Sequence, residues 1–179
     1  MHKILIAVNG NFECQIRRLK EAGFEVYQKS ISSYKDEKVV AEEISSFNCI
    51  IVGGGPWNAN VLKYAKEKGN LKMLVKFGVG VDNIDIDAAT RLGIAVSNAP
   101  GSNARAVAEH ALALILAITR KIVIFDRNIK SGSWSGGMSD TVIGKTIGLL
   151  GFGNIAAKLA EYLKSFPVSI IAYDIHRDE

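Results

Sequence analysis

The sequence predicts an α/β protein, with a doubly wound parallel sheet followed by the start of a second unit of the same class. Two observations lead to this fold class. Over residues 1–98, short apolar runs rich in β-branched residues alternate with amphipathic segments of helical length. Residues 146–174 then read as an apolar strand, a glycine-rich turn, a helix-length stretch and another apolar strand. Because such alternation joins parallel strands through crossover helices, we expect helices on both faces of the sheet.

Five strands are expected in the first unit. They lie at residues 3–8, 24–27, 49–52, 73–77 and 94–96. The helices between them are predicted by apolar residues that fall on one helical face. These residues are Phe12, Ile16 and Leu19; Val40, Ile44 and Phe47; and Val61, Leu62 and Ala65. A short fourth helix over 86–92 follows Asp85, a residue type that caps helix N-termini. We therefore expect residues 1–98 to form a flavodoxin-like domain.

A long helix is expected after the joint at residues 99–101, where proline and glycine interrupt the pattern. Ser102 or Asn103 can cap its N-terminus. We expect the helix to run through Thr119 and allow for its reaching Ile129.

The middle of this helix, residues 111–118, is apolar on every face. Such a helix must be buried all round. In a chain of this size we expect the burial at a domain or subunit interface, which favours a homodimer formed through the helix near residues 103–120. In the loop at 131–137, Trp134 is expected to act as a hydrophobic anchor.

The turn at residues 151–156 has the spacing of a dinucleotide fingerprint. Gly151 permits the tight turn, Gly153 lets the backbone approach a pyrophosphate, and Ala156 allows close helix–strand packing. The pyrophosphate would lie on the amides that open the following helix. Asp174 ends the next strand, where it could accept hydrogen bonds from ribose hydroxyls and would repel a 2′-phosphate. The pattern favours NAD over NADP, with an ordinary turn beside a strand-end carboxylate as the alternative.

A complete dinucleotide-binding fold needs further strands after this point, and the sequence ends five residues after Asp174. We therefore expect residues 99–179 to hold the long helix and the first βαβ unit of an incomplete, truncated Rossmann NAD-binding domain.

Composition narrows the class of protein. The 179 residues are 48% hydrophobic and 22% charged, as in soluble globular proteins with a sizeable core. The net charge of +4 is mild and the lysines are spread out, so neither nucleic acid nor a membrane surface is an expected partner. The longest apolar run has eight residues, whereas a membrane span needs about 20. Cys14 and Cys49 suit free thiols in a reducing cytoplasm, and no metal-ligand spacing is present.

Four stretches of the chain form a recognisable set. They read Leu-Val-Lys-Phe-Gly-Val-Gly-Val-Asp-Asn-Ile-Asp at 74–85, Gly-Ile-Ala-Val-Ser-Asn-Ala-Pro-Gly at 93–101, Asn-Ala-Arg-Ala-Val-Ala-Glu at 103–109 and Gly-Lys-Thr-Ile-Gly at 144–148. In this order, and followed by the glycine turn, they resemble the D-isomer-specific 2-hydroxyacid dehydrogenases. The closest resemblance is to phosphoglycerate dehydrogenase-like members, over most of residues 70–174 and more loosely over 1–69.

The resemblance implies a substrate site in the first part of the chain. In such enzymes the loop that corresponds to Gly78, Val79 and Gly80 offers backbone amides to the substrate carboxylate. The start of the long helix lies beside the substrate and the nicotinamide, which implies contacts from Asn103 to the substrate and from Val107 to the cofactor.

The resemblance also implies the remaining cofactor contacts, from Gly151, Gly153, Asn154, Ile155 and Asp174. No catalytic residue is assigned, because the Arg, His and Glu that run the family's chemistry come from its later half, and no position here matches them. The loop at 53–57, Gly-Gly-Gly-Pro-Trp, departs from the many relatives that place Arg or Ser there. Only backbone contacts to substrate remain possible in that loop, and a phosphorylated substrate loses a charged partner.

The sequence therefore predicts an NAD-dependent dehydrogenase of small D-2-hydroxy acids by family, which moves hydride between NAD and a 2-hydroxy or 2-keto acid. The chain by itself is expected to be inactive, because the loss of an acid–base group alone costs about 10²–10⁴ in rate. The alternative is a non-catalytic dimerisation or binding module derived from the same scaffold.

Overall fold

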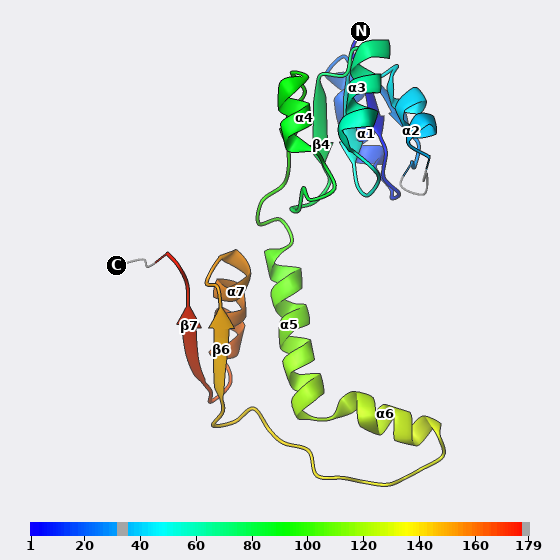
Figure 1. Ribbon diagram of the computed structural model, residues 1–179. Coiled ribbons are helices and arrows are strands. Elements are labelled where there is room, and N and C mark those ends of the chain that lie inside the picture. The colour runs from blue at the N-terminus through cyan, green and yellow to red at the C-terminus, as the bar shows by residue number, and fades with distance from the viewer. Residues whose placement is uncertain (32–35, 177–179) are drawn as a thin grey trace. The chain divides into compact units, whose positions relative to one another are not determined.

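The computed structural model describes residues 1–31 and 36–176. The chain forms two compact units, residues 1–100 and 101–179 (Figure 1). Each unit has a parallel sheet and helices of its own, and each is described by itself below.

The first unit is built on a five-stranded sheet. Its strands are β1 (Lys3–Ile6), β2 (Glu25–Gln28), β3 (Cys49–Val52), β4 (Met73–Lys76) and β5 (Ala95–Ser97). All neighbouring pairs are parallel, and their order is β2-β1-β3-β4-β5. This is the flavodoxin-like strand order, so the predicted fold class is confirmed. The five expected strands form with end shifts of at most two residues.

Four helices connect these strands. They are α1 (Glu13–Glu21), α2 (Glu37–Ile44), α3 (Ala59–Lys68) and α4 (Ile86–Arg91). Three of them begin at a side-chain cap that satisfies an otherwise unpaired helix amide. The cap before α4 confirms the prediction for Asp85, whose Oδ1 accepts from the Ala88 amide at 2.8 Å. Asp36 and Asn58 cap α2 and α3 in the same way.

The core of the first unit lies between the sheet and these helices. The strands contribute Leu5, Ile50 and Leu74, and α3 contributes Leu62, all fully buried. Trp57 is also fully buried, although it lies in the loop between β3 and α3. A loop residue that is part of the core fixes the position of that loop.

The second unit consists of α5 (Ala104–Thr119), α6 (Ile122–Lys130), β6 (Thr146–Leu150), α7 (Asn154–Leu163) and β7 (Ser169–Tyr173). β6 and β7 pair in parallel, and α7 packs beside α5 (Figure 1). The packing is carried by a small cluster that includes Ala108 from α5, Leu149 from β6 and Leu163 from α7. Leu150, at the end of β6, is 93% exposed.

One prediction for the long helix needs correction. The chain does not continue as one helix to Ile129, because it stops at Thr119 and Lys121 adopts a left-handed backbone with φ of 52°. The Thr119 hydroxyl donates to the Ile115 carbonyl at 2.6 Å, and the Arg120 amide donates to the Leu116 carbonyl at 2.9 Å. No glycine or proline marks this break in the sequence.

Within the second unit the apolar middle of α5 is covered only in part, since Leu114 and Ile118 are exposed. Its burial at a domain or subunit interface stays a prediction. Trp134 is 90% exposed and therefore does not anchor its loop as predicted. The residues packed against α5 come mainly from α7 and cover only one of its faces. The apolar residues on its remaining surface have no cover among the described residues.

Candidate functional site

Two loops of the first unit begin side by side at the carboxyl edge of the sheet. They are residues 53–58, after β3, and residues 77–85, after β4. Val52 is paired with Lys76 across the two strands, so both loops start at the same level. In sheets of this class ligands bind at the carboxyl ends of the strands.

Backbone contacts join these two loops. Trp57 donates its amide to the Asn83 carbonyl at 3.3 Å and accepts from the Asp85 amide at 2.9 Å. Its indole nitrogen donates to the Gly54 carbonyl at 2.9 Å. Through these three bonds the buried tryptophan ties both loops to the core.

Lys76 and Asn83 form a second link that sequence reasoning missed. Lys76 Nζ donates to the Gly53 carbonyl at 2.7 Å and to Asn83 Oδ1 at 2.8 Å. Asn83 Nδ2 donates to the carbonyls of Gly53 at 3.2 Å and Gly55 at 3.3 Å. The one available signal was the position of Lys76 at the carboxyl end of a parallel strand.

The loop expected to hold a substrate carboxylate is fixed through its carbonyl groups. Gly78 has a φ of 149°, and its carbonyl accepts from the Ala99 amide at 2.9 Å. The Val79 carbonyl accepts from Asn98 Nδ2 at 2.7 Å. The amides of Val79 and Gly80 donate to no acceptor within residues 1–31 and 36–176. Two neighbouring free amides are suited to binding an anion.

In the second unit, the turn between β6 and α7 has the predicted form. Gly151 has a φ of 88°, which side chains other than glycine rarely adopt, and its amide donates to the Tyr173 carbonyl at 2.7 Å. Asp174 Oδ2 accepts from the Phe152 amide at 2.5 Å, and its Oδ1 accepts from the His176 amide at 2.8 Å. Asp174 therefore holds the turn in place, a role the sequence analysis did not assign.

The environment of Asp174 favours its charged form. The hydrogen bond from the Phe152 amide, followed by that from the His176 amide, lowers the pKa of the carboxyl below its usual value. Each carboxylate oxygen has a second lone pair beyond these bonds, which could accept from a ribose hydroxyl.

The turn leaves open space beside its two glycines. A Cβ built on Gly151 or Gly153 meets no atom within 4 Å, so the space beside both glycines is open. The N-terminus of α7 begins at Gly153 without a side-chain cap, and Asn154 and Ile155 are exposed. Free helix amides together with open space fit a pyrophosphate.

The start of α5 lies next to this turn. Asn154 Nδ2 is 3.4 Å from the position of a Cβ built on Gly101. Asn103 stands at the N-cap position of α5, but its side chain makes no capping bond, so the expected cap is wrong. Asn103 and Val107 are both exposed on the first turns of the helix.

The predicted site residues thus fall into two groups. The first unit contains Gly78, Val79 and Gly80, and the second contains Asn103, Val107, Gly151, Gly153, Asn154, Ile155 and Asp174. Within the described residues, no three His, Cys, Asp or Glu side chains gather as they would around a metal ion. Across the same residues, no helix is both long and apolar enough to cross a membrane.

Comparison with known proteins agrees with these features. A family model described as D-isomer specific 2-hydroxyacid dehydrogenase, catalytic domain, matches residues 6–169. The D-3-phosphoglycerate dehydrogenase of Archaeoglobus fulgidus is 39% identical over 175 residues, which cover 96% of this chain and 32% of that protein.

Solved structures of this architecture include a protein from Thermus thermophilus, with a TM-score of 0.84 and 25% identity over 99% of this chain and 57% of that one. They also include an NAD⁺-bound 3-phosphoglycerate dehydrogenase of Entamoeba histolytica, with a TM-score of 0.78 and 27% identity over 97% of this chain and 54% of that one. The chain spans about a third of the curated relative and just over half of these solved chains. With its sheet order, its glycine turn and a family match over most of its length, the chain belongs to the D-isomer-specific 2-hydroxyacid dehydrogenases and is similar to phosphoglycerate dehydrogenases.

Proposed function

We propose that this chain provides the substrate-carboxylate loop and the first part of the cofactor site of an NAD-dependent dehydrogenase of small D-2-hydroxy acids. The free amides of Val79 and Gly80 are the observation that carries this proposal. They lie in the stretch where the family resemblance implies carboxylate binding.

The substrate carboxylate is assigned to these two amides, whose conformation is held by Asn98 and by the Ala99 amide. Asn103, at the start of α5, has a side chain free of bonds among the described residues and is assigned to the substrate as well. When bound, NAD accepts or returns the hydride. The protein's part is to orient the acid against it.

The cofactor is assigned to the second unit. Gly151, Gly153 and the uncapped amides of Asn154 and Ile155 would receive the pyrophosphate. Asp174 would accept hydrogen bonds from ribose hydroxyls, and its negative charge would repel a 2′-phosphate, which favours NAD. The NAD⁺-bound 3-phosphoglycerate dehydrogenase of Entamoeba histolytica, to which this chain is similar, agrees with this assignment.

The 179 residues alone are proposed to be inactive. No Arg, His or Glu of this sequence matches the family's acid–base and substrate-orienting groups, and loss of the acid–base group alone costs about 10²–10⁴ in rate. Cys14 and Cys49 are free thiols, which suits a reducing compartment and agrees with the proposed cytoplasmic location.

A chimera tests the assignment. Residues 1–176 would be joined to the remainder of the Archaeoglobus D-3-phosphoglycerate dehydrogenase, and NADH oxidation would be followed with a series of 2-keto acids. We expect turnover by the chimera and none by the 179-residue chain. Turnover by the chain alone would refute the proposed inactivity, and a folded chimera that reduces no keto acid would refute the assignment.

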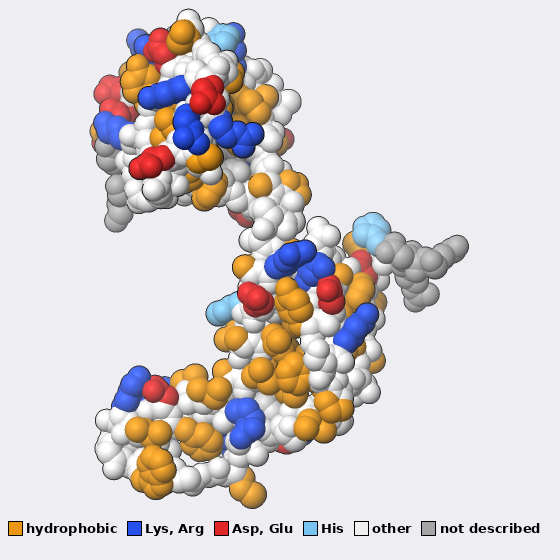
Figure 2. Space-filling model, turned by 180° about the vertical axis from the view of Figure 1, so that it is seen from behind, with side chains coloured by type: hydrophobic (Ala, Val, Ile, Leu, Met, Phe, Trp, Pro, Cys, Tyr) orange, Lys and Arg blue, Asp and Glu red, His pale blue; other side chains and the backbone are white. Residues whose placement is uncertain are grey.

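The alternative function, a dimerisation module, is supported by one surface. We define the arm as α5, α6 and residues 131–138. Ile118 and Val123 line an apolar hollow of about 260 Å³ between α5 and α6. In Figure 2, apolar side chains gather over the second unit, and those exposed on the arm include Leu114, Ile118, Ile122, Val123, Ile124, Ile129, Trp134 and Met138.

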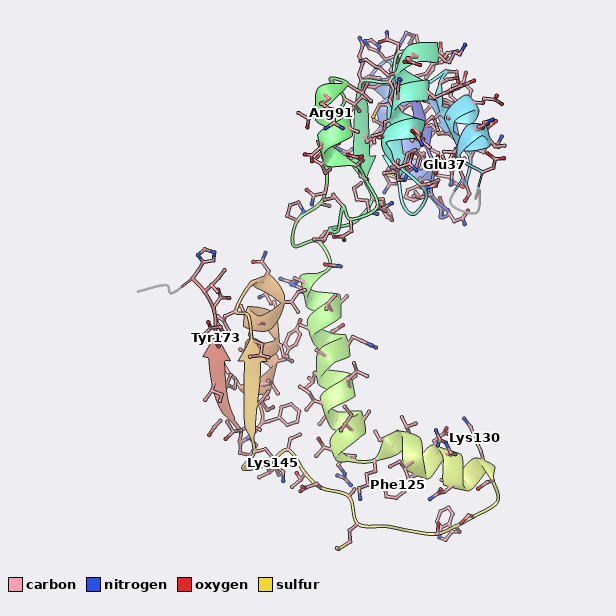
Figure 3. All side chains as sticks on the ribbon, viewed as in Figure 1. Glu37, Arg91, Phe125, Lys130, Lys145 and Tyr173 are labelled. Carbon is pink, nitrogen blue, oxygen red and sulfur yellow. The ribbon has the colours of Figure 1, made fainter. Side chains whose placement is uncertain are left out.

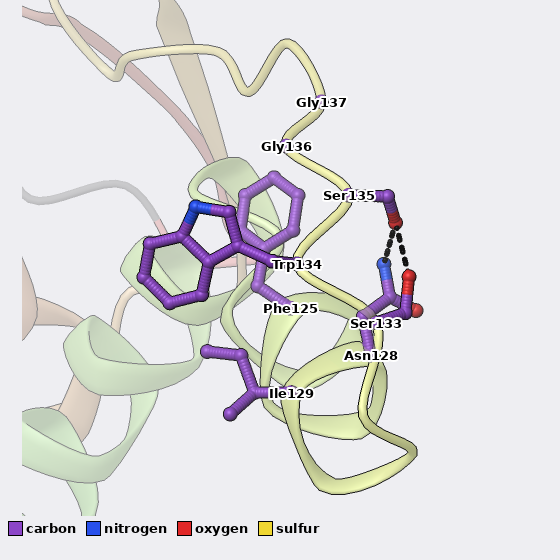
Figure 4. A pocket seen from close by; sticks show the side chains of 8 residues that line it. All are labelled: Phe125, Asn128, Ile129, Ser133, Trp134, Ser135, Gly136 and Gly137. Atoms are coloured by element: carbon purple, nitrogen blue, oxygen red, sulfur yellow. Dashed lines mark hydrogen bonds between the residues drawn. The ribbon is translucent and has the colours of Figure 1, made fainter.

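The far end of the arm has a second hollow, of about 240 Å³. Phe125 on α6 (Figure 3) and Trp134 from the following loop line it. Ser135 accepts from Asn128 Nδ2 and from the Ser133 hydroxyl (Figure 4). An exposed apolar surface of this extent is typical of protein contacts. We propose that a second copy of the chain covers it, with α5 near residues 103–120 at the interface.

Sedimentation of Ile118→Asp tests this interface, with Ser165→Asp, which adds the same charge at an exposed residue outside the arm, as the matched control. We expect the wild-type chain and the control to be dimers and Ile118→Asp to be a monomer. A wild-type monomer at all concentrations would refute the dimer and, with it, the alternative function.

A further inference from the structure

Lys76 is a half-buried lysine whose partners are all uncharged. Its ammonium donates to the Gly53 carbonyl at 2.7 Å and to Asn83 Oδ1 at 2.8 Å. No carboxylate forms an ion pair with it in the part of the chain that the structure describes. Its ammonium therefore has no salt-bridge partner among those residues.

Lys76 and Asn83 bond to two of the three carbonyls in the loop at Gly53, Gly54 and Gly55. The Gly53 carbonyl accepts from Lys76 and from Asn83 Nδ2, and the Gly55 carbonyl accepts from the same amide at 3.3 Å. The Gly54 carbonyl accepts from the indole of Trp57. All three carbonyls thus accept hydrogen bonds from side chains.

The amides of this loop are left free. Neither Gly54 nor Gly55 donates to an acceptor among the described residues, which is also true of Val79 and Gly80 in the adjoining loop. Gly54 and Gly80 are exposed. The two loops therefore have unused donors at one edge of the sheet, and the ammonium of Lys76 bonds to a carbonyl in one of these loops.

We propose that Lys76, acting with Asn83, is a positioning residue for the anionic substrate. It keeps the carbonyls of Gly53 and Gly55 turned inward, so that the amides of Gly54 and Gly55 join those of Val79 and Gly80 in binding a carboxylate. Its own charge favours the anion from a distance and does not touch it. The inference rests on the proposed function, because it deepens the substrate site of that enzyme.

The glycines explain why the positive charge comes from Lys76 on β4 and not from the loop itself. Residues 53–55 carry no side chain beyond hydrogen, so the loop itself has no cation to offer an anion. The Lys76 ammonium bonds to a carbonyl of the loop and leaves the amides of Gly54 and Gly55 free for the anion. The ligand class that fits is a small 2-keto or 2-hydroxy carboxylate.

Titration of the chain with oxalate, followed by the ¹H–¹⁵N spectrum, tests the inference without any turnover. In the wild-type chain, we expect the amide signals of Gly54, Gly55, Val79 and Gly80 to shift together. Lys76→Gln keeps a donor but removes the charge, and we expect it to weaken oxalate binding roughly tenfold. Lys76→Arg keeps the charge and should retain most of the affinity.

Lys72→Gln is the matched control. Lys72 is exposed and lies just before the same strand, so its loss removes equal charge without touching either loop. We expect it to bind oxalate like the wild-type chain. If Lys76→Gln loses its dispersed spectrum, Asn83→Ala takes its place, and it should weaken the shifts of Gly54 and Gly55 most.

Three results would overturn the inference. The first is a wild-type chain in which oxalate leaves the four amides unmoved. The second is a folded Lys76→Gln or Asn83→Ala variant that titrates like the wild type, and the third is equal weakening of oxalate binding in Lys72→Gln. The chimera of the preceding section is judged by NADH oxidation, so failure of the proposed function is recognised separately from failure of this inference.

Discussion

Replacement of Trp57 by phenylalanine should destabilise the first unit and disturb the candidate substrate loop together. The indole is fully buried, and its Nε1 donates to the Gly54 carbonyl at 2.9 Å. Phenylalanine fills most of the same space but has no donor. The Gly54 carbonyl would then lose its side-chain partner.

The expected loss is about 2 kcal/mol. A net hydrogen bond contributes about 1 kcal/mol. The smaller ring removes on the order of 40 Å² of buried apolar surface, which at about 25 cal/mol per Å² contributes roughly 1 kcal/mol more. Trp57→Ala, which leaves a cavity, should cost about 3–5 kcal/mol.

Native-state hydrogen exchange of the β3 and β4 amides measures this loss within the first unit alone. Trp134→Phe is the matched control, because it makes the same chemical change at a side chain that is 90% exposed. We expect that variant to alter the exchange of β3 and β4 by less than about 0.5 kcal/mol. The reasoning is refuted if both tryptophan variants have equal effects, or if Trp57→Phe leaves the Gly54 and Gly55 amide signals in place.

Three further predictions concern glycines and Asp174. Gly69→Ala should destabilise the first unit by at least about 2 kcal/mol in hydrogen exchange, because its Cβ would lie 1.7 Å from the Ser45 carbonyl oxygen; a smaller loss would show that the backbone yields easily. Gly151→Ala, at a φ of 88°, should lower the unfolding free energy of the second unit by about 1–2 kcal/mol. Gly153→Ala, at a φ of −77°, should lower it by less than about 0.5 kcal/mol. Equal losses for the two variants in urea unfolding would contradict this reasoning. Because backbone hydrogen bonds lower the pKa of Asp174, its contribution to stability should be complete above its unfolded pKa of about 3.9 and be lost as the pH falls through the lower folded value. An NMR titration that finds this pKa at or above the ordinary one would contradict the turn geometry.

Local patterns were sufficient to predict the first unit. Alternating apolar runs gave its five strands, and capping residues such as Asp85 marked helix starts, because both signals depend on neighbours a few residues apart. The glycine turn at 151–156 was predicted for the same reason, since Gly151 adopts the backbone that its residue type permits. For the candidate site, these local patterns predict where the loops lie but not the contacts that hold them in place.

The remaining features depend on contacts that are distant in the sequence. Lys76 and Asn83 bond to the Gly53 carbonyl across sequence separations of 23 and 30 residues, and no local pattern predicts hydrogen bonds between residues so far apart. Trp134 was expected to pack against its own loop, yet its apolar ring is exposed within the chain. Hydropathy shows that a side chain favours burial, but it does not name the surface that buries it.

The second unit should depend more strongly on binding than the first. Its sheet has two strands in the described residues, and such a pair is marginal unless a packed face supports it. α5 and α7 support one face, while Leu150, Ile171 and Tyr173 remain exposed. The glycine turn therefore belongs to the less stable part of the chain, where any ligand that binds only the folded state has the most to stabilise. Slower exchange of the β6 amides on addition of NADH, with β3 and β4 unchanged, would locate the cofactor in this unit; slowing in β3 and β4 alone would place it elsewhere.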